Sequence, residues 1–91
     1  MLYVVYSKKY KKSLRKYVSS GSFPKQELID VVNDLKNRKI LPIKYNDHQL
    51  KGDFDGTREC HIRPDILLIY QIKDKELILL LVNIGSHSKL F

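Results

Sequence analysis

The sequence predicts a single α+β domain: an N-terminal strand, a two-helix hairpin, and then an antiparallel β-sheet, with the helices packed on one sheet face. Short β-branched and aromatic runs occur near both ends of the chain, which is typical of strands. Apolar residues recur at helical spacing between them. The chain has 91 residues and contains no repeat or linker-like segment, so residues 1–91 are expected to form one domain with one core.

The first half contains one strand and two helices. Residues 2–6 (LYVVY) form a short β-branched and aromatic run, which favours a strand. Ser7 is a plausible N-cap of a helix that ends at Gly21, and a second helix is expected from Pro24 to about Arg38. The apolar residues at helical spacing are Tyr10, Leu14, Tyr17 and Val18 in the first helix, and Leu28, Val31, Val32 and Leu35 in the second.

The second half is expected to supply the antiparallel strands. Residues 43–56 are rich in Asn, Asp and Gly, which favours a loop. Residues 57–62 (TRECHI) alternate, so that Arg58, Cys60 and Ile62 would share one face while Glu59 and His61 lie on the other.

Two further apolar runs, at 66–72 and 76–84, predict a hairpin with a tight turn at 73–75. The helices should cover one face of the sheet. The loop, the strand ends and the C-terminal tail are expected to gather near one edge.

The positive charge is concentrated at the start of the chain. The formal net charge is +7, and seven of the 17 basic residues lie in residues 1–26, where there is no acidic residue. Such a field favours a polyanionic partner, which is a nucleic acid, an anionic membrane surface or an acidic protein. The alternative is a solvated helix face that keeps a small protein soluble. The seven residues are Lys8, Lys9, Lys11, Lys12, Arg15, Lys16 and Lys25.

Cysteine content and hydropathy predict a cytoplasmic protein. The single cysteine, Cys60, cannot form an internal disulfide, which favours a reducing compartment. The N-terminal run MLYVVY lacks the order of charges of a signal peptide. The longest apolar runs, ILLIY and LILLLV, are much shorter than the roughly 20 residues that span a bilayer.

All three histidines lie in the second half, beside loops or strand ends: His48, His61 and His87. Each alone would be an ordinary surface histidine, but together with Asp65, Glu59 and the tail they form a candidate acid/base cluster. Cleavage of RNA needs a base for the 2′-hydroxyl proton, an acid for the leaving 5′-oxygen and cations for the phosphate; histidine, with a pKa of about 6.5, suits either proton-transfer role. Glu59 is interpreted as a strand-surface partner of a neighbouring cation rather than as a catalytic group.

No metal or cofactor is expected. The His61 and Asp65 of HIRPD are separated by a proline and do not form a helical pair, and neither HExxH nor CxxC occurs. The chain also lacks a Gly-rich phosphate loop, a Ser/His/Asp motif and an EF-hand loop.

The second half resembles a known family. The stretch HQLKGDFDGTRECHIRPDILLIY, followed by a hairpin and GSHSKLF, is similar to the YafQ-type branch of the RelE/ParE superfamily of bacterial toxins from type II toxin–antitoxin systems. The resemblance covers residues 48–91. Three elements recur in order: G-x-x-x-G-x-R-E-x-H-I-x-P-D, the LLIY strand and G-S-H-S-x-L-F.

The resemblance implies a RelE/ParE-like fold and a ribosome-dependent, metal-independent mRNA endoribonuclease that inhibits translation. By motif position its catalytic residues would be His48, His61, Asp65, His87 and Phe91. His87 would be the general acid, and Phe91 would stack on a base. The general base stays open among His48, His61 and Asp65, and Asp65 would alternatively orient a histidine.

One departure concerns phosphate binding. Relatives often carry an arginine and a threonine where this chain has Asn83 and Ile84. If that arginine steadies the scissile phosphate, the role passes here to another cation, or the activity is weaker. The candidate cations are Lys51, Arg58, Arg63 and Lys89, while Lys8, Lys9, Lys11, Lys12, Arg15 and Lys16 would grip ribosomal RNA.

The partners implied are a cognate RelB/DinJ-like antitoxin, the ribosome with its mRNA, and operator DNA only through the antitoxin; no membrane is implied. The antitoxin would be acidic or amphipathic and would fold against the basic surface. Two alternatives stay open. One is a ParE-like toxin that binds a protein such as gyrase and cleaves nothing, and the other is a degenerate toxin that acts as an antitoxin-binding co-repressor.

Overall fold

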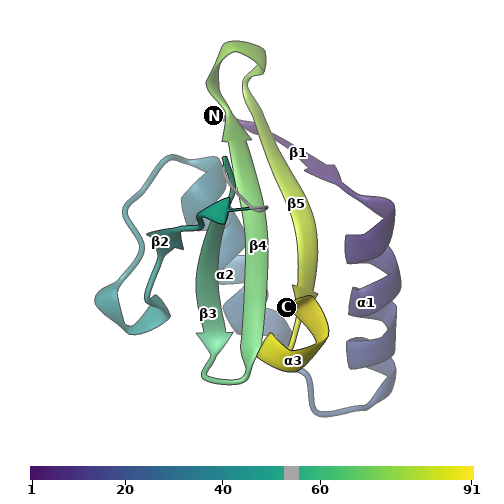
Figure 1. Cartoon of the computed structure of the whole chain (residues 1–91). Helices are drawn as coiled ribbons and strands as arrows, with labels where there is room; N and C mark the ends of the chain where they lie inside the picture. The colour runs from purple at the N-terminus through teal and green to yellow at the C-terminus, as the bar shows by residue number, and fades with distance from the viewer. Residues whose placement is uncertain (53–55) are drawn as a thin grey trace.

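The computed structural model describes residues 1–52 and 56–91 and confirms the predicted α+β order (Figure 1). The two helices are α1 (Lys8–Ser19) and α2 (Lys25–Lys36). The strands are β1 (Tyr3–Tyr6), β2 (His48–Gln49), β3 (Arg58–Arg63), β4 (Ile66–Lys73) and β5 (Ile78–Gly85). A single helical turn, α3 (His87–Leu90), follows β5. No helix within residues 1–52 and 56–91 has the length and apolar character needed to cross a membrane.

The strands form one sheet in the order β1-β5-β4-β3-β2. The strands β3, β4 and β5 pair antiparallel, as predicted. The sheet as a whole is mixed, because β1 pairs with β5 in parallel, with Tyr3 opposite Ile78 and Tyr6 opposite Leu81. The crossover from β1 therefore places the N-terminal strand beside the last strand of the sheet.

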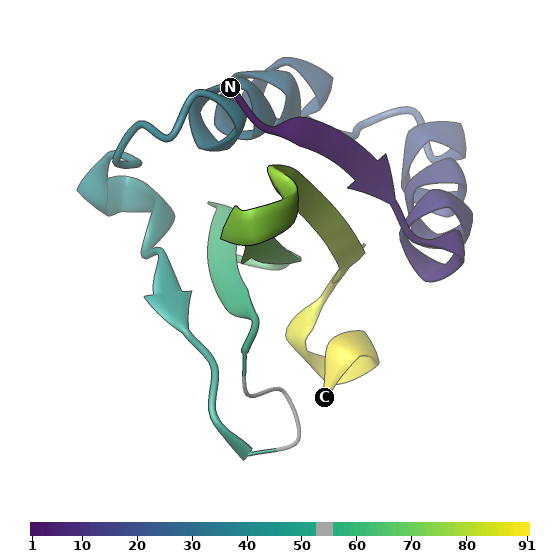
Figure 2. The same ribbon diagram turned by 90° about the horizontal axis from the view of Figure 1, so that it is seen from above.

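The helices cover one face of the sheet, here called the helix face (Figure 2). Ser7 caps α1 as predicted, since its side-chain oxygen accepts a hydrogen bond from the backbone N–H of Tyr10 at 3.0 Å. Gly21, just after α1, has a φ of +86°, which a residue with a side chain rarely adopts. The core between helices and sheet is built from apolar side chains, among them Tyr10, Val31, Leu35, Cys60, Leu68, Tyr70, Leu79, Leu81 and Ile84.

Two predicted irregular segments have more structure than expected. The predicted loop 43–56 contains a 3₁₀ turn, η1 (Ile43–Tyr45), and the two-residue strand β2; part of it, 53–55, lies outside the described residues. The predicted turn at 73–75 is a 3₁₀ turn, η3 (Asp74–Glu76), after which Leu77 has a positive φ of 56°. As a result β5 begins at Ile78 rather than at residue 76.

A β-bulge interrupts β5. Ile69 lies opposite Asn83 and Tyr70 lies opposite Leu81, so Val82 is an extra residue on β5. Helix α1 holds this bulge, because the Ser7 hydroxyl donates to the Val82 carbonyl at 2.5 Å and the Ser13 hydroxyl donates to Oδ1 of Asn83 at 2.9 Å. The bulge shifts the alternation of side chains by one residue beyond Leu81.

Buried phenols and a buried thiol make the fold sensitive to alkaline pH. Burial raises the pKa of Tyr10 to about 12 and that of Cys60 to about 12, from ordinary values of 10.0 and 9.0. Because these pKa values are higher in the folded state, their stabilising contribution is complete below about pH 9 and is lost as the pH rises toward 12. We expect the free energy of unfolding, measured with urea, to fall steadily between pH 9 and 11. The Cys60→Ala variant should show a shallower fall; equal values for the wild type at pH 8 and pH 11 would contradict the prediction.

Candidate active site

Two histidines and a glutamate meet on the face of the sheet opposite the helices, here called the open face. Oε2 of Glu59 lies 3.5 Å from Nε2 of His48, and Oε1 of Glu59 lies 3.3 Å from Nε2 of His61. The two imidazole centroids are 6.3 Å apart. The Glu59 side chain is only 5% exposed, whereas those of His48 and His61 are 43% and 25% exposed. A buried carboxylate is costly unless polar groups compensate it, and the two imidazoles are polar groups that face Glu59.

The interpretation of Glu59 as a surface partner of a cation is wrong. Its side chain does lie on the same face as His61, as the alternation predicted, but it is buried between two imidazoles. The sequence did not reveal this, because the contact depends on β2. The short β2 strand pairs His48 directly with Glu59, and it forms within a segment whose composition predicts a loop.

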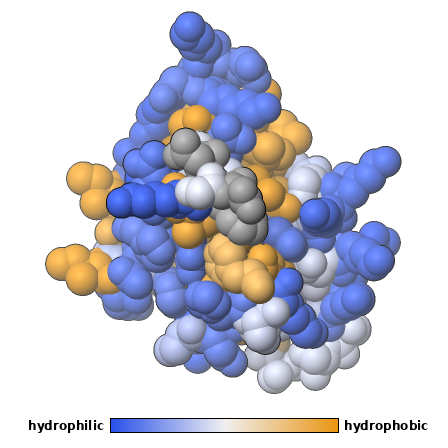
Figure 3. Space-filling view, in the orientation of Figure 1, coloured by the Kyte–Doolittle hydropathy of each residue, from blue (hydrophilic) through white to orange (hydrophobic). Residues whose placement is uncertain are grey.

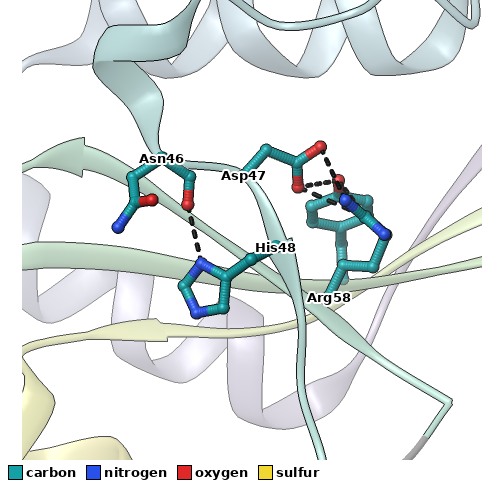
Figure 4. A network of polar contacts seen from close by, with 5 residues as sticks. Asn46, Asp47, His48 and Arg58 are labelled. Carbon is teal, nitrogen blue, oxygen red and sulfur yellow. Dashed lines mark hydrogen bonds and ion pairs between the residues drawn. The ribbon is translucent and has the colours of Figure 1, made fainter.

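The ring of His48 is oriented by the backbone carbonyl of Asn46, two residues earlier in the chain (Figure 4). Asn46 has a left-handed conformation (φ 47°, ψ 49°), which turns the chain so that its carbonyl oxygen lies 2.8 Å from Nδ1 of His48. Asparagine tolerates this conformation better than most residues. When Nδ1 donates to that carbonyl, Nε2 of a neutral His48 carries the lone pair, and it faces Oε2 of Glu59.

A second network fixes the same segment to the sheet (Figure 4). The buried Tyr70 hydroxyl donates to Oδ1 of Asp47 at 2.5 Å, and Nε and Nη2 of Arg58 donate to the two oxygens of Asp47 at 3.3 and 3.2 Å. The hydrogen bond to Asp47 raises the pKa of Arg58, and burial raises the pKa of Tyr70. Asp47 thus joins β2 to β3 and β4 immediately beside His48.

A third histidine lies on α3. The His87 and Phe91 rings have centroids 4.9 Å apart at an angle of 48°. His87 is exposed, and the Phe91 residue is 46% exposed. The turn can fold back onto β5 because position 85 is glycine: a Cβ there would lie 3.2 Å from Cδ2 of Leu90.

The His48–Glu59–His61 contact and the His87–Phe91 pair, here called the two groups, lie on the same face of the sheet. β2 and α3 both stand on the side opposite α2 (Figure 2). Across the strands, His61 pairs with Leu67, and Leu67 pairs with Gly85, which is two residues before His87. β3 and β5 are separated by β4 alone, which corresponds to about 10 Å at two strand spacings. The predicted gathering near one edge is therefore wrong, because the segments gather over one face instead.

The floor between the two groups is apolar. Leu67 and Ile69 of β4 are 1% and 2% exposed, and they alternate with Leu68 and Tyr70, which belong to the core under the helices. Figure 3 shows an apolar area in the middle of this largely hydrophilic face. Leu67 and Ile69 thus pack beneath this face, and titratable groups lie on both sides of them.

The remaining predicted site residues lie outside these two groups. Asp65 is exposed in the β3–β4 turn and is not part of the histidine–glutamate contact. Arg58 belongs to the Asp47 network, and Arg63 donates to both carboxylate oxygens of Glu27 on α2, at 2.8 and 2.7 Å. The exposed cations are Lys51, Lys89 and the six of α1: Lys8, Lys9, Lys11, Lys12, Arg15 and Lys16.

Asn83, which stands where relatives often carry an arginine, makes hydrogen bonds that connect β5 to α1. Its Oδ1 accepts from the Ser13 hydroxyl at 2.9 Å and from the backbone N–H of Ile84 at 2.9 Å. Lys16 and Lys89 line the same small hollow as Asn83, between α1 and α3. Cations thus stand near the position that an arginine would occupy. In the described part of the chain, no three His, Cys, Asp or Glu side chains are arranged to hold a metal ion.

Solved structures similar to this one include bacterial toxins. A metal-bound toxin from Helicobacter pylori matches with a TM-score of 0.92 and 47% identity, covering 100% of both chains. The toxin of the Escherichia coli DinJ–YafQ complex matches with a TM-score of 0.85 and 30% identity, covering 100% of this chain and 99% of that one. The fold is therefore the one seen in this class of bacterial toxins.

The chain belongs to the YafQ family, bacterial toxins of type II toxin–antitoxin systems, whose sequence profile matches residues 2–91. The mRNA interferase toxin YafQ of E. coli strain K12 is 40% identical over 57 residues. That alignment covers 63% of this chain and 60% of the relative, which is less than two thirds of the relative's length. The resemblance inferred from residues 48–91 is confirmed and extends over nearly the whole chain.

The hydroxyl of Tyr70 should matter for stability although it lies below the site. The Tyr70→Phe variant leaves one oxygen of Asp47 without its shortest hydrogen bond, so we expect a loss of about 1–3 kcal/mol in the free energy of unfolding. Urea denaturation measures it. The matched control is Tyr3→Phe on exposed β1, which should change the value by less than about 0.5 kcal/mol. Equal stabilities of the two variants would show that the Asp47 network contributes little.

Proposed function

We propose that the protein is an mRNA interferase, a metal-independent endoribonuclease that cuts mRNA on the ribosome and thereby inhibits translation. The observation that carries the proposal is that the His48–Glu59–His61 contact, at β3, and the His87–Phe91 pair, just after β5, lie on the same face of the sheet, where β3 and β5 are separated by β4 alone. The name of the E. coli relative, an mRNA interferase toxin, supports it independently.

The reaction needs only proton transfers and phosphate binding. A base removes the 2′-hydroxyl proton, the 2′-oxygen attacks the adjacent phosphorus, and the bond from phosphorus to the 5′-oxygen breaks, leaving a cyclic phosphate and a 5′-hydroxyl. We assign the base side to the His48–Glu59–His61 contact, where Glu59 orients both imidazoles. His87 is the acid that protonates the departing 5′-oxygen. Asp65, exposed in its turn, is assigned no proton transfer.

Cations and an aromatic ring would hold the RNA. Lys89 is two residues from His87, and Lys16 lines the same hollow as Lys89. We therefore assign Lys16 and Lys89 to the scissile phosphate. Phe91 beside His87 offers a ring face for a base. The six exposed cations of α1 are assigned to ribosomal RNA, whose phosphates they would contact.

The basic surface formed by the exposed cations of α1 also suits a protein partner. We propose a DinJ-like antitoxin that docks on the basic surface and blocks the open face, with operator DNA bound only through it. The E. coli relative is seen in complex with DinJ, which supports this assignment. Net charge of +7 favours an acidic partner chain.

His87 provides the sharpest test of the activity. The His87→Ala variant removes the acid, so cells expressing it without antitoxin should grow, whereas cells expressing the wild type should stop growing. Mapping of transcript 5′ ends measures cleavage, and purified assays in the presence of EDTA test metal independence. Ser88→Ala, on the same helical turn, is the control and should stay toxic. Toxicity of His87→Ala at equal expression would exclude His87 as the essential acid.

Glu59 should matter through its charge. The Glu59→Gln variant keeps the size of the side chain but cannot compensate a protonated histidine, so we expect cleavage to fall about 10²-fold or more. Rates of cleavage of ribosome-bound mRNA measure the effect. Glu76→Gln, on the exposed η3 turn, is the control and should leave the rate unchanged. A Glu59→Gln rate within about twofold of the wild type would remove Glu59 from the proton-transfer group.

A further inference from the structure

A hollow of about 470 Å³ adjoins the histidine–glutamate contact and has no role in the mechanism above. We call it the β3-edge pocket. It is lined by Lys44, Tyr45, Asn46, His61, Arg63 and Pro64, together with Glu27 and Ile62. Its volume lies within the roughly 300–1,000 Å³ range of small-molecule sites.

The pocket exists because β2 is short. β2 pairs only with Arg58 and Glu59, so the remainder of β3 has no strand beside it on that side. The η1 turn and Asn46 stand opposite this free stretch, and the N-terminal part of α2 contributes Glu27. A hollow is left along the outer edge of β3.

The pocket is continuous with the candidate active site through two shared residues. His61 lines it and also contacts Glu59. Asn46 lines it, and its carbonyl oxygen orients His48. An RNA strand with its scissile phosphate beside these histidines would therefore place a neighbouring nucleotide at the pocket.

The lining combines the groups that a nucleotide needs. The pocket has two cations for a phosphate, Lys44 and Arg63. Both are held in position: Nζ of Lys44 lies 5.1 Å from the centroid of the Tyr45 ring, and Arg63 is bound by both oxygens of Glu27. Pro64, which is exposed, supplies apolar surface for a base.

Asn46 supplies the means to discriminate between bases. Its side-chain amide carries both a donor and an acceptor, the pair that reads a base edge. Its left-handed backbone fixes where that amide projects, while the carbonyl is already used by His48. Recognition by the side chain and orientation of His48 by the backbone are thus separable.

We propose that the β3-edge pocket is a nucleotide subsite, which binds the nucleotide next to the cleaved bond and makes cleavage depend on the identity of its base. The proposal rests on the proposed nuclease function and adds a specificity determinant, Asn46, to it. Lys44 and Arg63 hold the phosphate of that nucleotide.

The first test measures binding without cleavage. The ¹⁵N-labelled His87→Ala protein is titrated with each of the four nucleoside 5′-monophosphates and followed by NMR. We expect amide shifts confined mainly to residues 44–46 and 61–64, with one nucleotide bound best. Asn46→Gly removes the side-chain amide, and glycine tolerates the positive φ of this position, so the variant should weaken that binding about 3- to 10-fold. Asn37→Gly, at the exposed C-cap of α2, is the control and should bind like the parent protein.

The second test measures base preference in cleavage. Wild type and Asn46→Gly are compared on ribosome-bound mRNAs that carry each of the four bases on either side of the cut. The wild type should prefer one base at one of these positions, and Asn46→Gly should reduce that preference by lowering the rate on the preferred mRNA more than on the other three. If no nucleotide moves the pocket amides, or if Asn46→Gly retains the wild-type preference, the subsite is refuted. A wild type that cuts no mRNA would refute the nuclease function, and the NMR titration would still decide whether the pocket binds nucleotides.

Discussion

The bulge at Val82 decides which residues of the C-terminal segment reach the open face. Up to Leu81 the odd-numbered residues of β5 face the helices, and after the extra residue Ile84 takes that position in the core. Gly85 consequently pairs with Leu67 on the open face, and α3 starts there. A one-residue shift in a strand exchanges its two faces, so a β5 without the bulge would direct the tail toward the helices. The hydroxyls of Ser7 and Ser13 on α1 hold this irregularity, which ties the N-terminal helix to the geometry of the C-terminal histidine.

The other half of the site depends on a second local irregularity. Asn46 turns the chain in a left-handed conformation, and after it the side chains of two successive residues serve opposite purposes: Asp47 bonds to Tyr70 and Arg58, whereas His48 contacts Glu59. Alternation along β2 makes this division possible. The Asp47–Tyr70–Arg58 network on one face restrains the strand, and the imidazole of His48 on the other face stays accessible to solvent. Rigid support under a solvent-accessible titratable group is what proton transfer requires.

Periodicity was sufficient to predict the elements that are regular. The Ser7 cap of α1, the apolar stripes of α1 and α2, the alternation in β3 and the apolar runs of β4 and β5 were all visible in the sequence, because burial of one face leaves a repeating pattern. What could not be predicted depends on single residues. The run LILLLVNI is apolar on both sides of the bulge, so its shift of faces leaves no pattern. The pairing of His48 with Glu59 arises from a two-residue strand in an Asn- and Asp-rich segment, and its partner lies eleven positions away. Glu59 therefore looked like a surface residue, and the β3-edge pocket, which exists because that strand is short, had no signature at all.

The distribution of charge suggests how the chain manages without an arginine at position 83. The excess positive charge lies in the first 26 residues, mainly on α1. Both α1 and α3 contact β5, so this charge lies near α3. Lys16 of α1 and Lys89 of α3 share a hollow there, while Lys44 and Arg63 stand on the opposite side, beside His61. A phosphate chain laid across the open face would meet cations at both ends and would pass over the buried Leu67 and Ile69 in the middle. The buried Glu59 lies beneath one end, where the imidazoles screen it from the backbone phosphates. Two lysines on mobile stems impose less geometry on a phosphate than a bidentate guanidinium does, so positioning in this chain would depend more on the pocket and on the aromatic ring beside His87.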